Sequence, residues 1–473
     1  MKRALSLILV AIMALMLVPA IGVAAADGTA KSDYVVYLNG TTGADTNDGK
    51  TEATAVATLA KAIEIANTYT AATEVVVVVT GETSLGNVQH QILPENTPRI
   101  CVTGNYDGKD YGSKLVTNTD APVSLLYLNG DFTFEYINLD CRRDNFILCM
   151  QYNNVKIGYG VTVTPLESRK DQYAAWPILL VGCNGDTSGV HDKAVGDPTF
   201  THDVLIEVYS GEWQYVRGGD RDAATTFDGK MDIIIDGIKT KIIASDTSFS
   251  ASNNNNAPTG KGNYGPNAKI TMTVSNCEFY NFIGNVYVQP TPGNVSNADI
   301  TINIKEGVSA KYFCAVQKNN ATFNGKLTVN VYGGDFSGII KTMFTNQTVA
   351  NGGVGTVTIN HNPNDPASVA AFTALKNACV DDTDVIYGEI AAAPVVTDAP
   401  TTDAPVVTDA PVVTDAPVVT DAPVVTDAPV VTTVAPAEPE DTPATGDASV
   451  MVVFAAAAVL CVAAVVVIKK REN

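Results

Sequence analysis

Residues 138–145 of the sequence, NLDCRRDN, concentrate two carboxylates and two guanidinium groups in one short stretch. The carboxylates are Asp140 and Asp144, with Arg142 between them. Paired carboxylates are the groups that general acid–base catalysis on sugars uses. Asp, Arg and Asn are also common in exposed turns, where opposite charges form weak surface pairs. The stretch is therefore a candidate catalytic cluster, with a charged turn as the alternative.

A second stretch places charges close to aromatic rings. Arg217 and Asp220 lie in a glycine-containing turn, shortly after Trp213 and Tyr215. Aromatic rings beside charged groups are suited to stacking on a sugar ring while its hydroxyls are held by hydrogen bonds. We therefore regard Trp213 and Tyr215 as candidate ligand-binding residues and Arg217 and Asp220 as candidate catalytic residues. A charged turn is again the alternative.

The elements that would position these clusters belong to a repeated strand pattern. Each repeat begins with a strand of alternating apolar and polar residues. The six starts are Val204, Met231, Ile270, Ile300, Leu327 and Val357. The intervals between them run from 27 to 39 residues. A polar insertion, residues 245–265, makes one interval long, and we expect it to be a surface loop.

Each repeat has room for three short strands. Ile300, Ile302 and Ile304 alternate with polar residues, so one face of that strand should be buried. Gly or Asn follows the first strand of most repeats, where a turn with positive φ is easiest. Three short strands per repeat are typical of one coil of a parallel β-helix, which buries its apolar face only against stacked neighbours. Residues 34–389 would hold about a dozen coils at a strand spacing of ~4.8 Å.

The N-terminal part of this region carries a family resemblance. The sequence YVVYLNGTTGADTNDGKTEATAVATLAKAIEIAN resembles the first segment of secreted right-handed β-helix proteins of the pectate-lyase-like class. The resemblance implies a strand, a loop and a helix that caps the first coil, with Val56, Leu59 and Ile63 on the buried helix face. The expected fold class is all-β: a right-handed parallel β-helix (solenoid) with an N-terminal capping helix. A string of β-sandwich domains is the alternative, although no linker interrupts residues 33–390.

The same resemblance bears on chemistry. Active members of that class use acidic residues, often with calcium, and a basic residue that removes a proton beside a uronate carboxylate, and their hydrolytic relatives use paired carboxylates. The matching candidates here are the charged residues of the two clusters. In the N-terminal loop, Asp45, Asn47 and Asp48 are candidate calcium ligands, but Gly49 stands where a further ligand would be needed. We expect a turn without a cofactor at this loop, with calcium as the alternative.

The two ends of the chain predict export and anchoring. Residues 1–26 combine a basic start, an apolar run and an A-x-A cleavage site, as in a signal peptide. The head would then be residues 27–390, followed by a stalk, residues 391–441, in which Pro recurs every sixth residue and forbids regular helix. We expect this Pro-rich stalk to be disordered and extended, as a plain linker or with O-glycosylated threonines. Residues 448–468 are uncharged and long enough for one C-terminal transmembrane helix.

The segment between the stalk and this apolar span carries a second resemblance. Thr442, Pro443, Ala444, Thr445 and Gly446 lie before the span, and the basic tail 469–473 follows it. The sorting motif, residues 442–447, resembles the LPxTG-like signal of Gram-positive cell-wall proteins, which sortase cuts between Thr and Gly to join Thr to peptidoglycan. Thr442 replaces the usual Leu. The expected location is the extracellular face of a Gram-positive bacterium, with the membrane, sortase and peptidoglycan as partners. Retention by the membrane alone is the alternative.

The net charge and the cysteine and histidine content exclude some partners and some kinds of site. The formal net charge of −20 argues against nucleic acid as a partner. The head has an odd number of cysteines and no C-x-x-C, so we predict small buried hydrophobic residues and not a disulfide framework. The cysteines concerned are Cys101, Cys141, Cys149, Cys183, Cys277, Cys314 and Cys379. The four histidines lack the spacing of metal ligands, so no zinc site is predicted.

Three functions fit these features. The head is an adhesin or glycan-binding module, a tethered polysaccharide lyase or glycoside hydrolase, or a structural surface component without a ligand. We favour the first, because an acidic head would repel uronate polymers unless calcium intervenes and no charged cluster dominates. The enzyme hypothesis requires the two charged clusters to converge in one groove beside Trp213 or Tyr215.

Overall fold

The computed structural model describes eleven segments of the first of two units of the chain, Met1–Val396. These segments are residues 28–118, 123–144, 146–172, 175–183, 199–220, 225–238, 248–250, 263–283, 295–315, 322–344 and 353–390. The predicted signal peptide, stalk, sorting motif, apolar span and basic tail lie outside them. No helix within these segments is long and apolar enough to cross a membrane.

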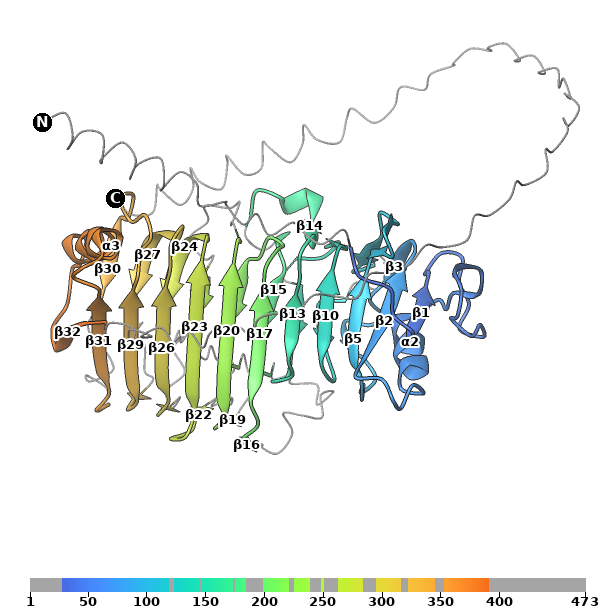
Figure 1. Cartoon of the computed structure of the whole chain (residues 1–473), viewed down its shortest axis with the longest axis horizontal. Coiled ribbons are helices and arrows are strands. Elements are labelled where there is room, and N and C mark those ends of the chain that lie inside the picture. The colour runs from blue at the N-terminus through green and yellow to red at the C-terminus, as the bar shows by residue number, and fades with distance from the viewer. Residues whose placement is uncertain are drawn as a thin grey trace, which may run out of the picture. The chain divides into compact units, whose positions relative to one another are not determined.

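The described segments are mainly strands in parallel sheets with two α-helices, which confirms the all-β class (Figure 1). The largest sheet has twelve parallel strands, and its strand order follows the order of the chain. These strands are β1 (Val35–Leu38), β2 (Glu74–Val79), β5 (Arg99–Thr103), β10 (Phe132–Glu135), β13 (Val155–Ile157), β17 (Val204–Val208), β20 (Lys230–Asp236), β23 (Lys269–Ser275), β26 (Asp299–Ile304), β29 (Lys326–Val331), β31 (Thr356–His361) and β32 (Val385–Glu389).

Three smaller parallel sheets accompany it. The nine-stranded sheet contains β4 (His90–Ile92), β9 (Leu125–Tyr127), β12 (Ile147–Cys149), β15 (Ile178–Leu180), β18 (Tyr215–Arg217), β21 (Ser248–Ser250), β24 (Glu278–Ile283), β27 (Ser309–Cys314) and β30 (Lys341–Met343). The four-stranded sheet contains β3 (Glu82–Ser84), β8 (Lys114–Val116), β11 (Asn138–Asp140) and β14 (Thr162–Thr164). The five-stranded sheet contains β16 (Thr199–Phe200), β19 (Thr226–Phe227), β22 (Asn263–Tyr264), β25 (Val295–Ser296) and β28 (Thr322–Phe323).

The remaining elements are short. One antiparallel hairpin joins β6 (Asn105–Tyr106) to β7 (Lys109–Asp110). The helices are η1 (Glu52–Thr54), α2 (Leu59–Ala66), η2 (Glu167–Arg169) and α3 (Pro366–Asn377). Within the predicted surface loop 245–265, residues 248–250 and 263–264 form β21 and β22 in two of the sheets, which corrects that part of the prediction, whereas residues 245–247 and 251–262 lie outside the described segments.

The chain visits the sheets in rotation. From β8 to β13 it passes from the four-stranded sheet to the nine-stranded sheet and on to the twelve-stranded sheet. From β17 to β29 the rotation becomes the twelve-, nine- and five-stranded sheets. Three strands per circuit agree with the repeat length seen in the sequence. Each circuit therefore adds one strand to each sheet that it visits.

The repeat starts predicted from the sequence are direct partners in the twelve-stranded sheet. Val204 pairs with Met231, and Met231 pairs with Ile270. The series continues through Ile300 and Leu327 to the sixth start, Val357. A slip of one residue would turn every apolar side chain to the opposite face, so burial fixes this register.

The hydrophobic core lies against the inward face of these strands. Ile300, Ile302 and Ile304 are almost completely buried, whereas the polar residues between them are partly exposed. The cysteine prediction also holds for most of its residues. Five head cysteines are buried, Cys314 and Cys379 are partly buried, and no disulfide links the seven. Burial raises the pKa of the Cys277 thiol to about 11, so the thiolate is disfavoured at neutral pH.

The N-terminal end shows how the free edge of β1 is covered. Val56, Leu59 and Ile63 are all buried, but α2 begins at Leu59, so the prediction of a shared helix face is right for Leu59 and Ile63 and wrong for Val56, which belongs to the preceding loop and bridges Leu38. The edge itself is paired by the preceding loop: the amide of Tyr37 donates to the carbonyl of Gly49 over 2.7 Å, and the amide of Val56 donates to the carbonyl of Tyr37 over 2.9 Å. The loop, and not the helix, therefore blocks the exposed strand edge.

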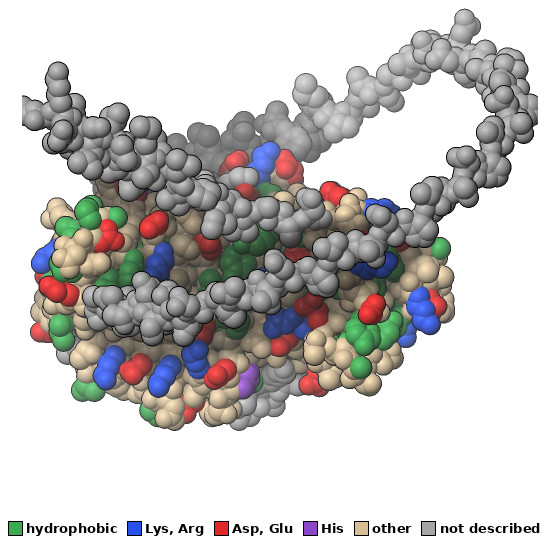
Figure 2. Space-filling model, viewed as in Figure 1, with side chains coloured by type: hydrophobic (Ala, Val, Ile, Leu, Met, Phe, Trp, Pro, Cys, Tyr) green, Lys and Arg blue, Asp and Glu red, His purple; other side chains and the backbone are tan. Residues whose placement is uncertain are grey.

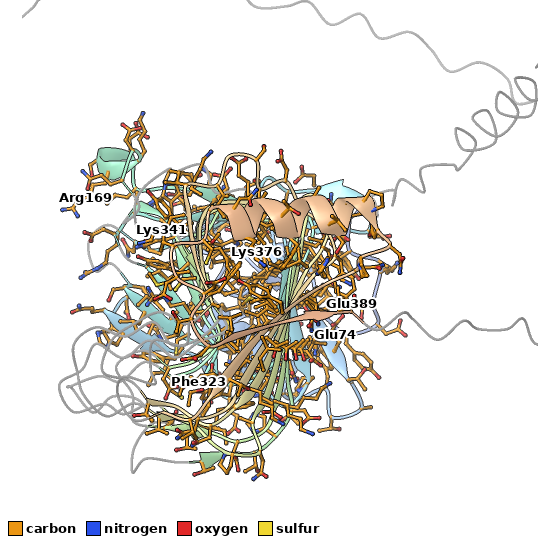
Figure 3. All side chains as sticks on the ribbon, turned by 90° about the vertical axis from the view of Figure 1, so that its left-hand side faces the viewer. Glu74, Arg169, Phe323, Lys341, Lys376 and Glu389 are labelled. Atoms are coloured by element: carbon orange, nitrogen blue, oxygen red, sulfur yellow. The ribbon has the colours of Figure 1, made fainter. Side chains whose placement is uncertain are left out.

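At the other end, α3 lies across the last strands (Figure 3). Asp365 caps the helix by accepting from the amide of Ala367, and a proline occupies its first turn. Phe372 and Leu375 on the helix are buried in the core. The chain then adds β32 beside β31, where Lys376 lies with its ammonium group 4.1 Å from the ring of Tyr387. The core is thus covered at both ends.

Close backbone approach explains why Gly325 precedes β29. A Cβ atom at this position would lie 1.9 Å from the carbonyl oxygen and 2.7 Å from the carbonyl carbon of Ala298. Because these are backbone atoms next to β26, they cannot move aside cheaply. We expect Gly325→Ala to lower the free energy of unfolding by about 3 kcal/mol. Urea denaturation followed by tryptophan fluorescence measures it, since both tryptophans, Trp176 and Trp213, are buried.

Gly333→Ala is the matched control. An added Cβ atom there would lie 3.5 Å from the nearest atom of Glu306, an ordinary contact. This variant should unfold close to the wild-type midpoint. Equal destabilisation of the two variants would contradict the close-approach argument.

Candidate functional site

The first predicted cluster is held together by ion pairs. Nη2 of Arg142 lies 3.1 Å from Oδ2 of Asp140 and 2.9 Å from Oε1 of Glu82. The amide of Arg142 also donates to the hydroxyl of Thr117 over 2.7 Å. Asp140 and Glu82 belong to β11 and β3 of the four-stranded sheet, so Arg142 ties two of its strands together. The guanidinium group and both carboxylates already have partners.

Asp144 does not join this cluster. Its Oδ2 lies 2.6 Å from Nη1 of Arg169, a residue of η2. The Arg169 side chain is exposed and that of Asp144 is partly exposed, and Arg169 lies at the periphery of the view in Figure 3. An exposed pair of this kind contributes about 0.5 kcal/mol to stability. Asp144 and Asp140 therefore do not form a paired acid and base in this structure.

The second cluster is buried. Arg217 ends β18 and is 5% exposed, with its guanidinium carbon 4.0 Å from the ring centre of Tyr215. Trp213 is 2% exposed, packs in the main core and donates its Nε1 hydrogen to the carbonyl of Ser210 over 3.0 Å. The expectation that Trp213 stacks on a sugar needs correction, because the core covers its ring. Tyr215 is 8% exposed and lies beneath Arg217.

Asp220 is completely buried. Its carboxylate accepts a hydrogen bond from the hydroxyl of Tyr152 over 2.8 Å and another from the amide of Cys183 over 2.8 Å. The hydroxyl of Thr225 donates to its second oxygen. Burial raises the pKa of Asp220, and the hydrogen bonds from Thr225, Cys183 and Tyr152 oppose that shift. Asp220 fastens the turn after β18 to neighbouring segments.

The two clusters therefore do not meet in one groove. Asp140 ends β11 of the four-stranded sheet and Arg142 is paired to it, whereas Arg217 belongs to the nine-stranded sheet and Asp220 is completely buried. The geometry that the enzyme hypothesis required, with Trp213 beside a convergent charged groove, is absent from the described segments.

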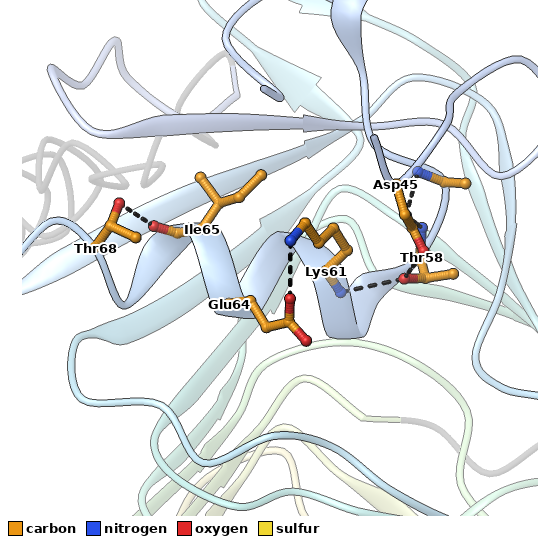
Figure 4. Close-up of polar contacts among 7 residues, drawn as sticks. Asp45, Thr58, Lys61, Glu64, Ile65 and Thr68 are labelled. Carbon is orange, nitrogen blue, oxygen red and sulfur yellow. Dashed lines mark hydrogen bonds and ion pairs between the residues drawn. The ribbon is translucent and has the colours of Figure 1, made fainter. Parts of the chain in front are cut away.

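The loop with the candidate calcium ligands uses its polar atoms internally (Figure 4). Oδ1 of Asp45 accepts from the amides of Ala57 and Thr58, each over 2.9 Å, and its Oδ2 accepts from the Thr58 hydroxyl over 2.8 Å. Asn47 donates to the carbonyl of Ala55 over 2.8 Å. A hydrogen bond from the Thr54 hydroxyl is the main cause that lowers the pKa of Asp48.

These contacts position the start of α2, whose first turn is capped by Thr58. Within the part of the chain that the structure describes, no three His, Cys, Asp or Glu residues form a metal-binding group. The contacts of Asp45, Asn47 and Asp48 support their role as turn residues.

A different site lies at the N-terminal end, on the outward face of the twelve-stranded sheet. A cleft of about 530 Å³ opens there, and we call it the aromatic cleft. Its lining residues are Lys31, Ser32, Asp33, Val35, Tyr37, Lys50, Glu52, Tyr69, Tyr106, Asp107, Lys109 and Tyr111. They come from the N-terminal segment, β1, the loop before α2, the turn after it and the β6–β7 hairpin. Four tyrosines in one cleft provide faces that stack on a sugar ring and hydroxyls that bond to it.

The β6–β7 hairpin forms one wall of the cleft. Its two-residue turn is Asp107 and Gly108, with φ of 50° and 76°. Positive φ at both positions is typical of the type I′ turn that an Asp-Gly pair favours. Tyr106, which precedes the turn, accepts from the amide of Ser32 over 2.8 Å and donates to its carbonyl over 3.2 Å. The N-terminal segment and the hairpin are thereby joined through the Tyr106 hydroxyl.

Apolar contacts form the floor of the cleft. Val76, Val78 and Cys101 make a small buried cluster on the face opposite the main core, together with Tyr106. Tyr37 and Tyr111 pack against this cluster and are partly buried, so each keeps some surface for a ligand. Side chains that are already packed against their neighbours lose little conformational entropy when a ligand binds.

Charges of both signs line the cleft and its margin. Glu52 accepts from Nζ of Lys109 over 2.8 Å and from the hydroxyl of Tyr111 over 2.7 Å. The Lys109 ammonium group also lies 4.2 Å from the ring centre of Tyr111. The bonds from Lys109 and then Tyr111 lower the pKa of Glu52, whereas burial and the bond to Glu52 raise the pKa of Tyr111. Glu52 thus holds the hairpin against the loop before α2.

Two cations of the cleft remain available. Lys31 and Lys50 are exposed and form no ion pair with another described residue. The lining contains three lysines and three carboxylates, so its formal charge is balanced. Figure 2 shows Lys, Arg, Asp and Glu side chains interspersed over the visible face of the molecule. An uncharged, hydroxyl-rich ligand matches such a cleft better than a polyanion.

Sequence reasoning missed the aromatic cleft. Its residues are spread from Lys31 to Tyr111, and no two of the four tyrosines stand closer than five positions. One local signal was present: the Asp-Gly pair between Tyr106 and Lys109 is a strong hairpin signal. That signal predicts a projecting hairpin, but not the sheet face over which it folds.

No protein-family model matches this sequence, and comparisons with curated proteins and with solved structures also give no match.

Proposed function

We propose that residues 27–390 form a right-handed parallel β-helix whose aromatic cleft binds carbohydrate. The rotation of the chain through parallel sheets, with one strand added to each per circuit, supports the β-helix. Right-handed crossovers between parallel strands are strongly preferred because of strand twist, which supports the handedness. The N-terminal resemblance to the pectate-lyase-like class agrees with both.

The observation that carries the binding function is the set of four tyrosines around one cleft of about 530 Å³. Aromatic faces match the apolar faces of sugar rings, and hydroxyl, carboxylate and ammonium groups match sugar hydroxyls. The proposal is recognition without turnover. The carboxylates suggested for catalysis are engaged elsewhere: Asp140 binds Arg142, Asp144 binds Arg169, and Asp220 is buried.

We further propose that this head is displayed as an adhesin at a Gram-positive cell surface. The support is in the sequence: the signal peptide, the Pro-rich stalk, the sorting motif at 442–447 and the apolar span 448–468. Sortase would join Thr445 to peptidoglycan. A stalk of 51 residues could place the head on the order of 160 Å from its anchor, at ~3.1 Å per residue when fully extended.

The test is retention of the full-length chain, purified in mild detergent, on immobilised neutral and acidic polysaccharides with and without calcium. We expect retention on neutral glycans, with no release of reducing ends or unsaturated products. Turnover that is lost in Arg142→Ala would replace this proposal with a tethered enzyme. Absence of retention on every glycan would favour the structural role.

The proposal also predicts a dependence on pH. Hydrogen bonds from Lys109 and Tyr111 hold the pKa of Glu52 below its ordinary value of 4.5. Because the folded pKa is lowered, the stabilisation that the Glu52 carboxylate gives to the cleft wall is fully present above pH 4.5 and is lost as the pH falls through the folded pKa. We expect glycan retention to weaken in that acidic range and to return on neutralisation.

Glu52→Gln separates this effect from general acid denaturation. The amide cannot form the charged contact with Lys109, so the variant should bind more weakly at pH 7 and show little further acid loss. An acid profile identical to that of the wild type would show that Glu52 is not the titrating group.

A further inference from the structure

A second concavity adjoins the β6–β7 hairpin. It has a volume of about 280 Å³, and we call it the polar hollow. Its lining residues are Asn105, Asp110, Gly112, Ser113, Tyr136, Ile137, Asn138, Gly160 and Thr162. Alternate residues of the hairpin line the two sites: Asn105 and Asp110 face the hollow, whereas Tyr106, Lys109 and Tyr111 face the aromatic cleft. Side chains alternate between the faces of a strand, so the hairpin is a thin wall between two neighbouring sites.

Neutral polar groups dominate the polar hollow. Of its nine lining residues, only Asp110 carries a formal charge. Asn138 donates to the Thr162 hydroxyl over 2.8 Å and accepts from the Thr164 hydroxyl over 3.1 Å. These carboxamide and hydroxyl groups can exchange bonds with sugar hydroxyls. The described lining residues of the polar hollow include no cluster of cations that would select a polyanion.

Tyrosines continue from the polar hollow along the same margin of the twelve-stranded sheet. Tyr136 directly follows β10, Tyr159 follows β13 by two residues, and Tyr209 directly follows β17. Backbone hydrogen bonds join neighbouring positions of this margin. The amide of Gly104 donates to the carbonyl of Tyr136 over 3.1 Å, and the amide of Tyr136 donates to the carbonyl of Tyr159 over 2.9 Å. The rings of Tyr159 and Tyr209 are stacked, with centres 5.3 Å apart and an angle of 25° between their planes.

Part of this aromatic margin faces solvent. Tyr159 is 43% exposed and is the one aromatic residue among the exposed large hydrophobic residues of the described segments. The Tyr209 hydroxyl donates to Glu207 over 2.7 Å, which fixes the ring beneath its neighbour. An exposed ring on a fixed support is a platform on which a sugar can stack without further ordering of the protein.

From these observations we propose that the aromatic cleft and the polar hollow are consecutive subsites for one linear, neutral polysaccharide chain. The chain crosses the β6–β7 hairpin and continues over Tyr159 and Tyr209. From β1 to β17 the sheet has five strand spacings, or about 24 Å, which would accommodate about five hexose units. The inference rests on the proposed function and adds that the ligand is the interior of a polymer and not a terminal sugar.

The experiment is a chain-length series. Linear β-1,3- and β-1,4-glucans, α-1,4-glucans and β-1,4-mannans, from disaccharide to long oligomers, are titrated calorimetrically into the full-length chain in detergent. We expect the affinity to rise with length until about five units are bound, because each added unit occupies a further subsite. This measurement needs no variant and therefore does not depend on how a substitution folds.

Tyr159→Ala then assigns the distal subsite, because this exposed side chain can be removed with little effect on folding. We expect about tenfold weaker binding of the long oligomer and unchanged binding of the disaccharide. Tyr332→Ala, near the opposite end of the same sheet, is the control and should alter neither. Equal affinity for short and long oligomers, or an equal loss for both in Tyr159→Ala, would overturn the inference while leaving the glycan-binding function intact. If no oligomer of any length binds, both fall.

Discussion

Replacement of Asp220 by Ala is expected to lower the free energy of unfolding by about 4 kcal/mol. The carboxylate is fully buried and accepts from Tyr152, Cys183 and Thr225. Removal of the acceptor leaves three buried donors without their partner, and each such loss costs about 1–3 kcal/mol. Urea denaturation followed by the fluorescence of the buried tryptophans measures the change.

Asp140→Ala serves as the control, because its carboxylate is partly exposed and bound only at the sheet surface. We expect this variant to lose less than about 1 kcal/mol. If Asp220→Ala were no less stable than Asp140→Ala, the assigned role of Asp220 as a buried acceptor would be wrong.

The pH dependence of Asp220 has a definite sign. Burial raises its folded pKa above the ordinary value of 3.8. At a pH between 3.8 and the folded pKa, the folded chain binds more protons than the unfolded chain. The contribution of this protonation to the free energy of unfolding is therefore fully present only below pH 3.8 and is lost as the pH rises through the folded pKa. Asp220→Asn removes this titration. The difference in stability between the wild type and Asp220→Asn should therefore shift in favour of the wild type as the pH is lowered from 7, and a shift in the other direction would contradict the assignment.

The second large effect is expected on binding. Tyr111→Ala removes an aromatic wall of the cleft, the hydrogen bond to Glu52 and the ring beneath Lys109. An aromatic anchor that the ligand covers typically contributes about 2 kcal/mol, so we expect the affinity for the retained glycan to fall about 30-fold. Titration calorimetry with the full-length chain measures it.

Two variants separate the causes of that loss. Tyr111→Phe keeps the ring and loses only the bond to Glu52, so most of the affinity should remain. Tyr332→Ala removes a comparable ring far from the cleft. The Lys305 ammonium group lies 3.3 Å from the centre of the Tyr332 ring, as the Lys109 ammonium group lies over the ring of Tyr111. Its affinity should equal that of the wild type. If Tyr332→Ala weakened binding as much as Tyr111→Ala, the cleft would not be the binding site.

The strand repeat could be predicted from the sequence because its causes are local. Alternation along one strand reports which face is buried, and recurrence of the pattern reports which residues become neighbours. The pairing of Val204 with Met231 and of Ile300 with Leu327 follows from those two facts. The insertion at 245–265 was harder, because β21 and β22 are too short and polar to show a period.

The candidate binding residues could not be derived in the same way. Trp213 and Tyr215 are close in sequence to charged residues, a pattern that fits an exposed site, yet the fold buries both. The outcome depends on where the circuit turns: Trp213 precedes β18 and lies in the core, and Asp220 follows β18 and enters the interior. Neither composition nor spacing determines which residues around that turn point inward.

The sequence alone thus determined the all-β class, the repeat, its register and the burial of most cysteines, because each depends on side-chain periodicity within a strand. It also supplies the export and anchoring features that the proposed display rests on. Only the tertiary structure decided where a ligand could bind. The aromatic cleft joins Lys31, Tyr37, Glu52 and Tyr111, and these residues meet because the hairpin folds back over the outward face of β1, β2 and β5. That contact is long-range, so no local pattern encodes it.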